Sequence, residues 1–241
     1  MKEISFDISG QTAVITGAGG IICGVMAKEM ARKGVRVALL DLFVDKAQQV
    51  VDEIRAEGGT AIAVKANVLD KASLEQAREE VLKEFGSVDI LVNGAGGNKA
   101  QATTGAELSF FDLDLDAFKW VFDLNVTGAV LTTMVFGELL AKQGYGNVIN
   151  IASMASYHPL TNTVAYCCGR ELHRVDGRTF QQELQHQHPR QCNCAGLPAD
   201  HAEPIPDAEG GRHAHGSRPA RAGQDADGAL RPAGGDGGRG D

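Results

Sequence analysis

Short runs of apolar residues alternate with amphipathic stretches from residue 12 to about residue 184. The apolar runs predict five buried strands, at residues 12–16, 35–41, 60–67, 88–97 and 146–153. The stretches between them carry apolar residues at helical spacing. They predict helices at residues 24–34, 45–59, 70–86, 114–144 (in two segments) and 164–184. Each predicted strand is therefore followed by a predicted helix.

The predicted strands are apolar along their whole length rather than at every second position. Such strands are typical of a parallel sheet that is covered by helices on both faces. The order of the elements therefore predicts an α/β fold with a doubly wound parallel sheet of the Rossmann type. Sheets of this kind bind ligands at the carboxyl ends of their strands, so the residues at those ends are the candidates for function.

The composition changes abruptly after Leu184. Beyond it the chain has no aromatic residue, and its only leucine, isoleucine or valine residues are Leu197, Ile205 and Leu230. A segment this poor in large apolar side chains buries too little surface to offset its loss of conformational entropy. We therefore expect a dinucleotide-binding domain over residues 1–184, with the last strands of the sheet missing, and a disordered tail over residues 185–241.

Charge and composition argue against several classes of partner. The formal net charge is -8, whereas nucleic acids and anionic membranes favour a basic face. No apolar run reaches the roughly 18 residues of a membrane span, and no leader-like segment opens the chain. The five cysteines have no framework spacing, which indicates reduced thiols. A cytoplasmic protein that acts on a small-molecule substrate is expected.

The segment "TGAGGIICG", from Thr16 to Gly24, joins the first strand to the first helix. A glycine-rich turn in this setting lets backbone N–H groups approach a pyrophosphate, and the helix N-terminus adds partial positive charge. Glycine is absent from two positions where such turns usually have it, which are occupied by Ile21 and Cys23. The alternative is a plain turn that binds no nucleotide.

Two further strand ends favour the nucleotide-binding interpretation. Asp41 ends the second strand, 24 residues after Gly17, where a carboxylate accepts both ribose hydroxyls of an adenosine and repels a 2′-phosphate. This favours NAD over NADP, although an Asp in this position is also a common helix cap. The segment from Asn93 to Gly97 forms a second glycine-rich turn, which by itself is also common between a strand and a helix.

A catalytic pattern follows the fifth predicted strand. Ser153 ends that strand, Tyr166 comes 13 residues later, and Arg170 lies four residues after Tyr166. Residues at this last spacing share one face of a helix, and a cation beside a phenol stabilises the phenolate. A serine hydroxyl can polarise a substrate carbonyl, and a nicotinamide can supply a hydride. Each of these residues taken alone is more often structural.

Taken in order, "TGAGG", Asp41, "NGAG", "FDLNV", "NIAS" and "AYCCGR" resemble the short-chain dehydrogenase/reductase family over residues 8–184. The resemblance implies that Asn125, Ser153 and Tyr166 are catalytic, with Arg170 in the place of the family's lysine. It implies that NAD is the cofactor and that family members form homo-oligomers. The cofactor-binding residues expected from the turns and the resemblance are Gly17, Gly19, Gly20, Ile21, Ile22, Asp41, Asn67, Val68, Asn93, Gly94, Ala95 and Gly96.

Longer stretches narrow the resemblance to one branch of that family. The segments "GAGGIICGVMAKEMA", "GAGGNKAQATT" and "FFDLDLDAFKWVFDLNV" resemble the D-mannonate oxidoreductase, or fructuronate reductase, branch. That branch tolerates an aliphatic residue and a cysteine in the glycine-rich turn. The resemblance therefore implies a substrate such as D-mannonate or D-fructuronate.

The chain departs from the family in two places. Arg170 keeps the positive charge of the lysine but not its compact geometry, so we expect lower turnover with cofactor binding partly kept. After the Tyr166 helix, "QHQHPRQCNCAGLPADHAEPIP" replaces the expected strand. Codons for this stretch, translated one base later, permit "NIRVNAIAPGF", which is the family's sequence there. We therefore hypothesise a frameshift near Gln185.

Two alternatives to an active enzyme remain open. The chain could be a non-catalytic, nucleotide-binding remnant of such an enzyme, or an interaction protein that uses residues 185–241 as a disordered arm. The tail also carries histidines beside a Cys-x-Cys pair. Their spacing matches no common zinc pattern, so no metal site is expected. These residues are His186, His188, Cys192, Cys194 and His201.

Overall fold

The computed structural model describes residues 7–158 and 160–170. All of them belong to the first of two units into which the chain divides, Met1–Cys194. The expected domain boundary after Leu184, the proposed frameshift and the tail lie outside the described residues. The predicted helix at 164–184 is described only over residues 164–170, which are helical.

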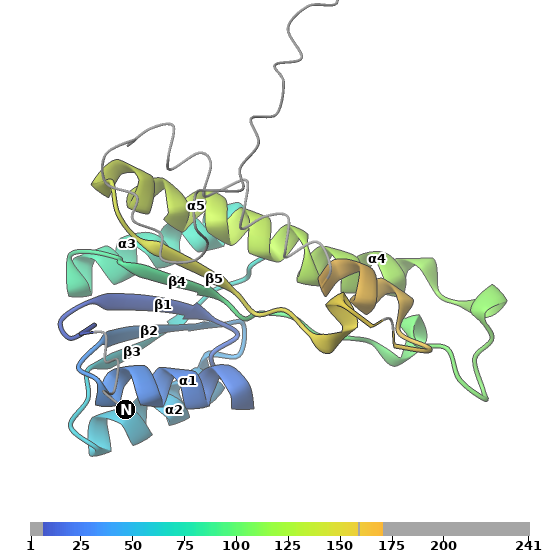
Figure 1. The fold of residues 1–241 in the computed structure, drawn as a ribbon, viewed down its shortest axis with the longest axis horizontal. Helices are drawn as coiled ribbons and strands as arrows, with labels where there is room; N and C mark the ends of the chain where they lie inside the picture. Colours follow the sequence, from blue (N-terminus) through green and yellow to red (C-terminus); the bar gives the residue numbers. More distant parts are fainter. Residues whose placement is uncertain (1–6, 159, 171–241) are drawn as a thin grey trace, which may run out of the picture. The chain divides into compact units, whose positions relative to one another are not determined.

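The centre of the described unit is a five-stranded sheet in which all strand pairs are parallel. Its order is β3-β2-β1-β4-β5 (Figure 1). The strands are β1 (Thr12–Thr16), β2 (Arg36–Asp41), β3 (Ala61–Lys65), β4 (Ile90–Asn93) and β5 (Asn147–Asn150). The predicted doubly wound parallel sheet is therefore confirmed.

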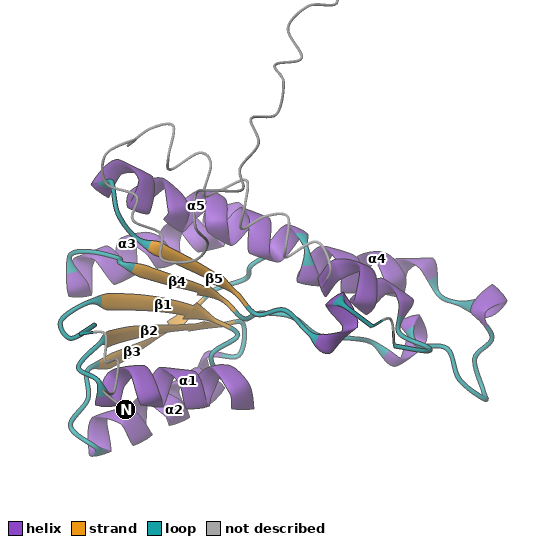
Figure 2. Cartoon of the chain, viewed as in Figure 1, coloured by secondary structure: helices purple, strands orange, loops and turns teal. Residues whose placement is uncertain are grey.

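Helices cover both faces of this sheet (Figure 2). They are α1 (Ile21–Arg32), α2 (Val44–Ala56), α3 (Lys71–Phe85), α4 (Leu115–Asn125) and α5 (Thr127–Gln143). Short 3-10 turns follow β4 and β5: η1 (Ala100–Ala102), η2 (Phe110–Asp112) and η3 (Met154–Ser156). Every predicted strand and helix within the described residues is present, with differences at the ends.

Alternate residues of the central strands point into two separate cores. Ile15 and Leu39 pack with α1 and α2, and Val14 and Leu40 pack with α3 and α5. All four side chains are buried. A strand that is buried on both faces has no solvent-facing positions, which is why the sequence shows continuous apolar runs instead of an alternation.

Turn residues explain where the observed ends differ from the predicted ones. Helix α1 begins at Ile21, three residues before the predicted start, because Gly20 is its extended N-cap. Strand β4 ends at Asn93, where the glycines begin, rather than continuing to residue 97. Helix α3 lies within its predicted range because the Asp70 side chain caps its start and Gly86 adopts the left-handed conformation at its end.

The order of connections reverses at β1. From β1 the chain proceeds through β2 to β3 on one side, then returns to place β4 and β5 on the other side. Open α/β sheets bind ligands beside the carboxyl ends of the strands at such a reversal. The turns that follow β1 and β4 are therefore the main candidates for a functional site.

The consecutive helices α4 and α5 form one long apolar segment. The segment Leu115–Gln143 is long and apolar enough to cross a membrane by length and composition, and half of its apolar window is buried. A core helix of a soluble protein passes the same test, so one such segment is weak evidence for a span. Phe136 and Leu140 of α5 are fully buried against the sheet and α3, which accounts for apolar positions there.

Candidate functional site

The turn after β1 packs directly on the turn after β4. Gly17 has a φ of +65°, and a Cβ atom at this position would lie 2.8 Å from the Cα atom of Ala95. Both the left-handed conformation and the close approach exclude a side chain here. Gly17 therefore lets two glycine-rich turns meet backbone to backbone at the point where the strand order reverses.

Thr16 holds the same two turns together, although it is not one of the expected cofactor-binding residues. Its hydroxyl oxygen accepts hydrogen bonds from the N–H groups of Gly94, at 3.1 Å, and Ala95, at 3.2 Å. The hydroxyl also lies 3.4 Å from the carbonyl oxygen of Val92, to which it donates. The only signal in the sequence was a hydroxyl residue at the end of a strand, because its partners are nearly 80 residues away.

Asp41 lies beside the first turn and has two backbone partners. Its Oδ2 accepts a hydrogen bond from the N–H of Gly19, and its Oδ1 accepts one from the N–H of Phe43, both at 2.9 Å. The N-cap residue of α2 is Phe43 and its helix has no side-chain cap hydrogen bond, so Asp41 is not the helix cap that the sequence offered as the alternative. Each carboxylate oxygen has a further lone pair, so these backbone bonds do not prevent acceptance of ribose hydroxyls.

The two unusual residues of the first turn have different surroundings. The Ile21 side chain is 88% exposed and the neighbouring Ile22 is 69% exposed, so the first turn of α1 presents apolar surface. Cys23 is buried, and its Sγ lies where a Cβ atom on Gly94 would be. Burial raises the pKa of the Cys23 thiol; the charge of Arg170 opposes this shift and that of Asp41 adds to it.

The expected cofactor residues after β3 and β4 do not all point toward the first turn. The Asn93 amide nitrogen donates to Thr133 Oγ1, at 2.9 Å, and to Asn150 Oδ1, at 2.8 Å. The Asn93 side chain thus links β4 to α5 and β5. Asn67 is exposed and accepts a hydrogen bond from a neighbouring backbone N–H, whereas Val68 is buried.

Asn125 anchors the turn after β4 from the end of α4. It is fully buried, and its amide nitrogen donates to the carbonyl oxygens of Gly97 and Val121, each at 2.7 Å. Its Oδ1 accepts the N–H of Gly97 at 3.3 Å. The neighbouring Gly96 lies against this oxygen, 2.7 Å from the place of a Cβ atom, and against the Arg170 guanidinium.

Tyr166 and Arg170 lie together on the last described helical turn. The Arg170 Cζ atom is 5.3 Å from the centroid of the Tyr166 ring. Arg170 is only 6% exposed, and its Nη1 donates to the carbonyl oxygen of Ile151 at 2.6 Å. Its Nε has no hydrogen-bond partner, and no ion pair joins it to an acid within the described residues. A guanidinium without a carboxylate partner therefore lies beside the phenol ring.

Ser153 lies on a segment that is tied to the Tyr166 helix. Ser153 is the N-cap residue of η3, and its Oγ accepts the N–H of Ala155 at 3.2 Å. The Ser156 hydroxyl donates to the backbone carbonyl of Arg170 at 2.8 Å. This bond fixes the segment after β5 against the residues that follow Tyr166.

The turn after β4 thus connects most of the expected site. It contacts Thr16, Gly17 and Cys23 on one side, and Asn125 and Arg170 on the other. Asn67 and Val68 lie after β3 instead, where Asn67 accepts a hydrogen bond from the N–H of Leu69. Two glycine-rich turns meet where the strand order reverses, which is where open α/β sheets bind nucleotides. A phenol and a cation lie next to them, and this arrangement suits carbonyl chemistry with a dinucleotide.

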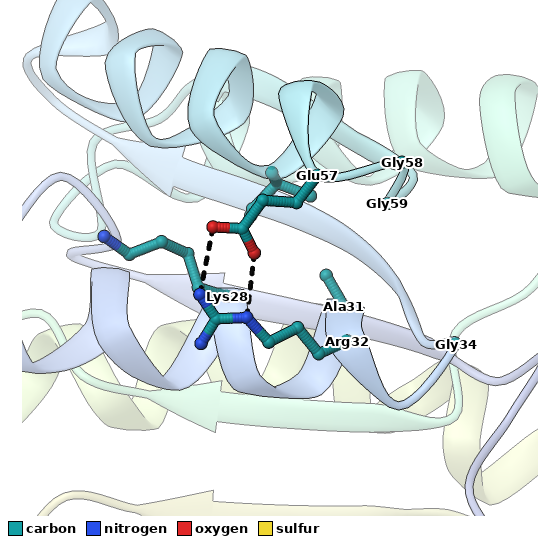
Figure 3. Close-up of a pocket in the computed structure, with 8 residues that line it drawn as sticks. Lys28, Ala31, Arg32, Gly34, Glu57, Gly58 and Gly59 are labelled. Atoms are coloured by element: carbon teal, nitrogen blue, oxygen red, sulfur yellow. Dashed lines mark hydrogen bonds and ion pairs between the residues drawn. The ribbon is translucent and has the colours of Figure 1, made fainter.

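A hollow of about 270 Å³ lies elsewhere, between the C-terminal ends of α1 and α2 (Figure 3). Arg32 and Glu57 form an ion pair there through two hydrogen bonds, at 2.8 Å and 3.0 Å, and Lys28 pairs with Glu53. These helix ends lead into β2 and β3, so the hollow lies near the amino-terminal ends of the strands. It does not include any expected site residue, and its charges already have partners.

We predict that the Thr16 hydroxyl stabilises the paired turns. Thr16→Val leaves the N–H groups of Gly94 and Ala95 without this acceptor, so the free energy of unfolding should fall by about 1–3 kcal/mol. Urea denaturation measures the change. Thr16→Ser keeps the hydroxyl and is the matched control; a loss as large as that of the valine variant would contradict the assignment.

Comparison with known proteins places this site in a family. The model of the short chain dehydrogenase family matches residues 11–188. An uncharacterized oxidoreductase of Bacillus subtilis, UxuB, is 48% identical over 178 residues, which cover 70% of this chain and 64% of that protein. D-threitol dehydrogenase of Mycolicibacterium smegmatis is 32% identical over 168 residues, or 70% of this chain and 62% of that protein. The chain therefore spans less than two thirds of the length of these curated relatives.

Solved structures of oxidoreductases resemble this chain as well. A candidate D-mannonate oxidoreductase from Haemophilus influenzae with bound NAD superposes with a TM-score of 0.70 and 37% identity, covering 75% of this chain and 68% of that one. The NAD+-bound xylitol dehydrogenase has a TM-score of 0.69 and 27% identity, covering 76% and 68%. The fold, the paired glycine turns and the sequence match agree: this chain belongs to the short chain dehydrogenase family.

Proposed function

We propose that this protein is an NAD(H)-dependent oxidoreductase that interconverts a carbonyl and a secondary alcohol on a sugar acid such as D-mannonate or D-fructuronate. The observation that carries the proposal is the position of Tyr166, with the Arg170 guanidinium 5.3 Å from its ring and packed on Gly96 of the turn after β4. A proton donor and a cation thus lie beside the turns that bind a dinucleotide in this fold.

The residues at the strand reversal fit NAD. Gly17 and Gly19 are positions where a Cβ atom would meet neighbouring atoms at 2.8 Å and 2.7 Å, so the backbone there is kept bare of side chains. The exposed Ile21 and Ile22 offer apolar surface next to it. The Asp41 carboxylate at Gly19 favours ribose hydroxyls and disfavours a 2′-phosphate. Asp41 and the first turn would hold the adenosine half.

Each proposed catalytic residue has a distinct task. When bound, NADH supplies a hydride to the carbonyl carbon of the substrate. The Tyr166 hydroxyl donates its proton to the carbonyl oxygen, and in the oxidative direction the phenolate takes the proton back from the alcohol. Ser153 donates a hydrogen bond to the same oxygen and orients it. Arg170 stabilises the phenolate electrostatically.

Asn125 acts through the backbone and through water. Its amide fixes Gly97 on both its N–H and its carbonyl group, so it holds the turn after β4 in place. We propose that it also supports a chain of water molecules that returns protons to Tyr166. Asn67 and Val68 are proposed to line the cofactor site from the end of β3.

The sugar-acid substrate rests on the branch of the family that this chain resembles. The Haemophilus influenzae structure described as a candidate D-mannonate oxidoreductase supports it. Relatives named for neutral polyols, D-threitol and xylitol, match over similar parts of the chain. The feature that separates these substrate classes is the carboxylate.

We predict that Tyr166→Phe strongly lowers turnover and keeps cofactor binding. Loss of the proton donor should lower kcat for D-fructuronate reduction by about 10²–10⁴-fold, while the binding of NADH, measured by its fluorescence, stays close to wild type. Tyr145→Phe is the control, because Tyr145 precedes β5 and lies at the opposite end of that strand from Ser153. An active Tyr166→Phe variant would refute the assigned role.

A non-catalytic remnant is the second candidate, and the surroundings of Arg170 favour it. The guanidinium donates to Ile151 and packs on Gly96, so the planar group is engaged where the family has a compact ammonium. This arrangement is compatible with binding the adenosine half of a dinucleotide without efficient chemistry.

The substitution Arg170→Lys separates the two candidates. If the guanidinium geometry limits an otherwise intact site, we expect the lysine variant to raise kcat for D-fructuronate, and Arg170→Met, which lacks the charge, to lower it. Equal rates in all three proteins would remove Arg170 from the catalytic group. NADH binding without turnover in every variant would favour the remnant.

We propose that the family domain comprises residues 1–184 and that residues 185–241 come from a shifted reading frame. The match to the family model ends at residue 188, and the codons beyond Gln185 permit a family sequence one base later. Sequencing the encoding DNA across codons 160–195 tests this. We expect one base to be gained or lost near codon 185; an uninterrupted frame in an independent template would overturn the proposal.

A further inference from the structure

The loop between β4 and α4 is anchored to the proposed catalytic residues at two points. At its start, Gly97 is hydrogen-bonded to Asn125 through its N–H and its carbonyl group. A few residues later, Ala102 of η1 is fully buried in a cluster with Ala165 and Tyr166. Lys99 lies between these anchors, two residues after Gly97. Figure 1 shows this green segment beside the helical turn that contains Tyr166.

The backbone of Lys99 is fixed by its neighbours. Its carbonyl oxygen accepts hydrogen bonds from the N–H of Ala102, at 3.1 Å, and from the hydroxyl of Thr103, at 2.9 Å. Its N–H donates to Asn98 Oδ1 at 2.9 Å, and the Asn98 amide nitrogen donates to the Thr103 hydroxyl at 2.9 Å. These bonds hold residues 98–103 as one short unit, so the backbone from which the Lys99 side chain extends is fixed by the loop itself.

The Lys99 side chain is held over an aromatic ring and not by an acid. Its ammonium nitrogen lies 4.0 Å from the centroid of the Trp120 ring, and the residue is half-buried. Within the described part of the chain no Asp or Glu forms an ion pair with it, as is also true of some other lysines such as Lys46, whereas Lys28, Lys71, Lys119 and Lys142 have such partners. A ring face orients an ammonium without neutralising its charge. The ammonium therefore remains available to an anion.

We infer that Lys99 binds the carboxylate of the acid substrate at this site. The inference rests on the proposed function, and it names the residue that gives the preference for acids. A carboxylate that meets an oriented ammonium forms a charge-assisted hydrogen bond. A neutral polyol of the same length lacks that partner and leaves the ammonium unused. Lys99 thus distinguishes sugar acids from the polyols that related enzymes use. It does so by binding the carboxylate, at the end of the substrate that is remote from the reacting carbon.

Trp120 makes the inference measurable by binding alone. It is the only tryptophan of the 241 residues, and it lies directly under the Lys99 ammonium. Any carboxylate that draws on this ammonium changes the surroundings of the indole. The emission of the full-length protein therefore reports on occupancy at Lys99, whether or not the protein turns over.

The experiment titrates D-mannonate, with D-mannitol as the neutral control, and follows Trp120 emission. We expect a saturable change with mannonate and none with mannitol. Lys99→Met should weaken the mannonate Kd about tenfold or more, the effect of losing one hydrogen bond between charged groups. Lys99→Arg keeps the charge and should retain most of the affinity. Lys119→Met, which removes a lysine on α4 that pairs with Asp116, should behave as wild type.

The outcomes separate this inference from the proposed function. Equal mannonate affinity in wild type and Lys99→Met, equal responses to mannonate and mannitol, or no response in wild type would each overturn the role of Lys99. NADH binding and turnover are measured separately on the same proteins. Binding of NADH with turnover of a neutral polyol, and no mannonate response, would keep the oxidoreductase and reject Lys99. A mannonate response that depends on Lys99, without NADH binding, would keep Lys99 and reject the proposed function.

Discussion

The close approach of the turns after β1 and β4 is the constraint on which the rest of the site depends. Gly17 lies so near Ala95 that no side chain fits between them, and the Thr16 hydroxyl binds the N–H groups of the second turn. Because buried backbone groups need partners, this hydroxyl helps to fix the path of the chain directly after β4, and Asn125 fixes it at Gly97. Asn125 and Arg170, from the Tyr166 helix, contact the other side of the same turn. A small displacement of these strands would move every proposed catalytic residue.

Two cations without acid partners among the described residues lie near this turn, in a protein of net charge -8. Arg170 is buried against the turn itself. Lys99 comes two residues after the turn, and its ammonium lies over the Trp120 ring. Half of the other lysines and arginines in the described ranges, Arg32 and Lys142 among them, are paired with acids. Unpaired positive charge is therefore available close to Tyr166, which suits a site that handles a dinucleotide phosphate and an acidic substrate.

The structure also gives physical reasons for residues that look unusual in a glycine-rich turn. Ile21 points into solvent, so a bulky side chain meets no steric barrier at that position. Cys23 fills the space above Gly94, and the match between a small thiol and a missing side chain explains why both are tolerated together. Arg170 differs from these two because its planar head is held by Ile151, which restricts how it can act in place of a lysine.

The sequence by itself determined the parallel sheet, the order of its helices and the positions of the glycine turns. These features are local: apolar periodicity and glycines act within a few residues, so they can be recognised without the fold. The spacing of Tyr166 and Arg170 was predictable for the same reason, since one helical turn joins them. The exact ends of α1 and β4 were not, because a cap or a turn decides them.

Only the tertiary structure decided which distant residues meet. It assigned Thr16 to the turn after β4, directed the Asn93 amide toward α5 and β5, and gave Asp41 two backbone partners. It also placed the Lys99 ammonium on Trp120 of the next helix. Contacts such as the bond from Thr16 to Gly94 join residues nearly 80 positions apart. The packing of whole layers brings such residues together, and no local pattern in the sequence records that packing.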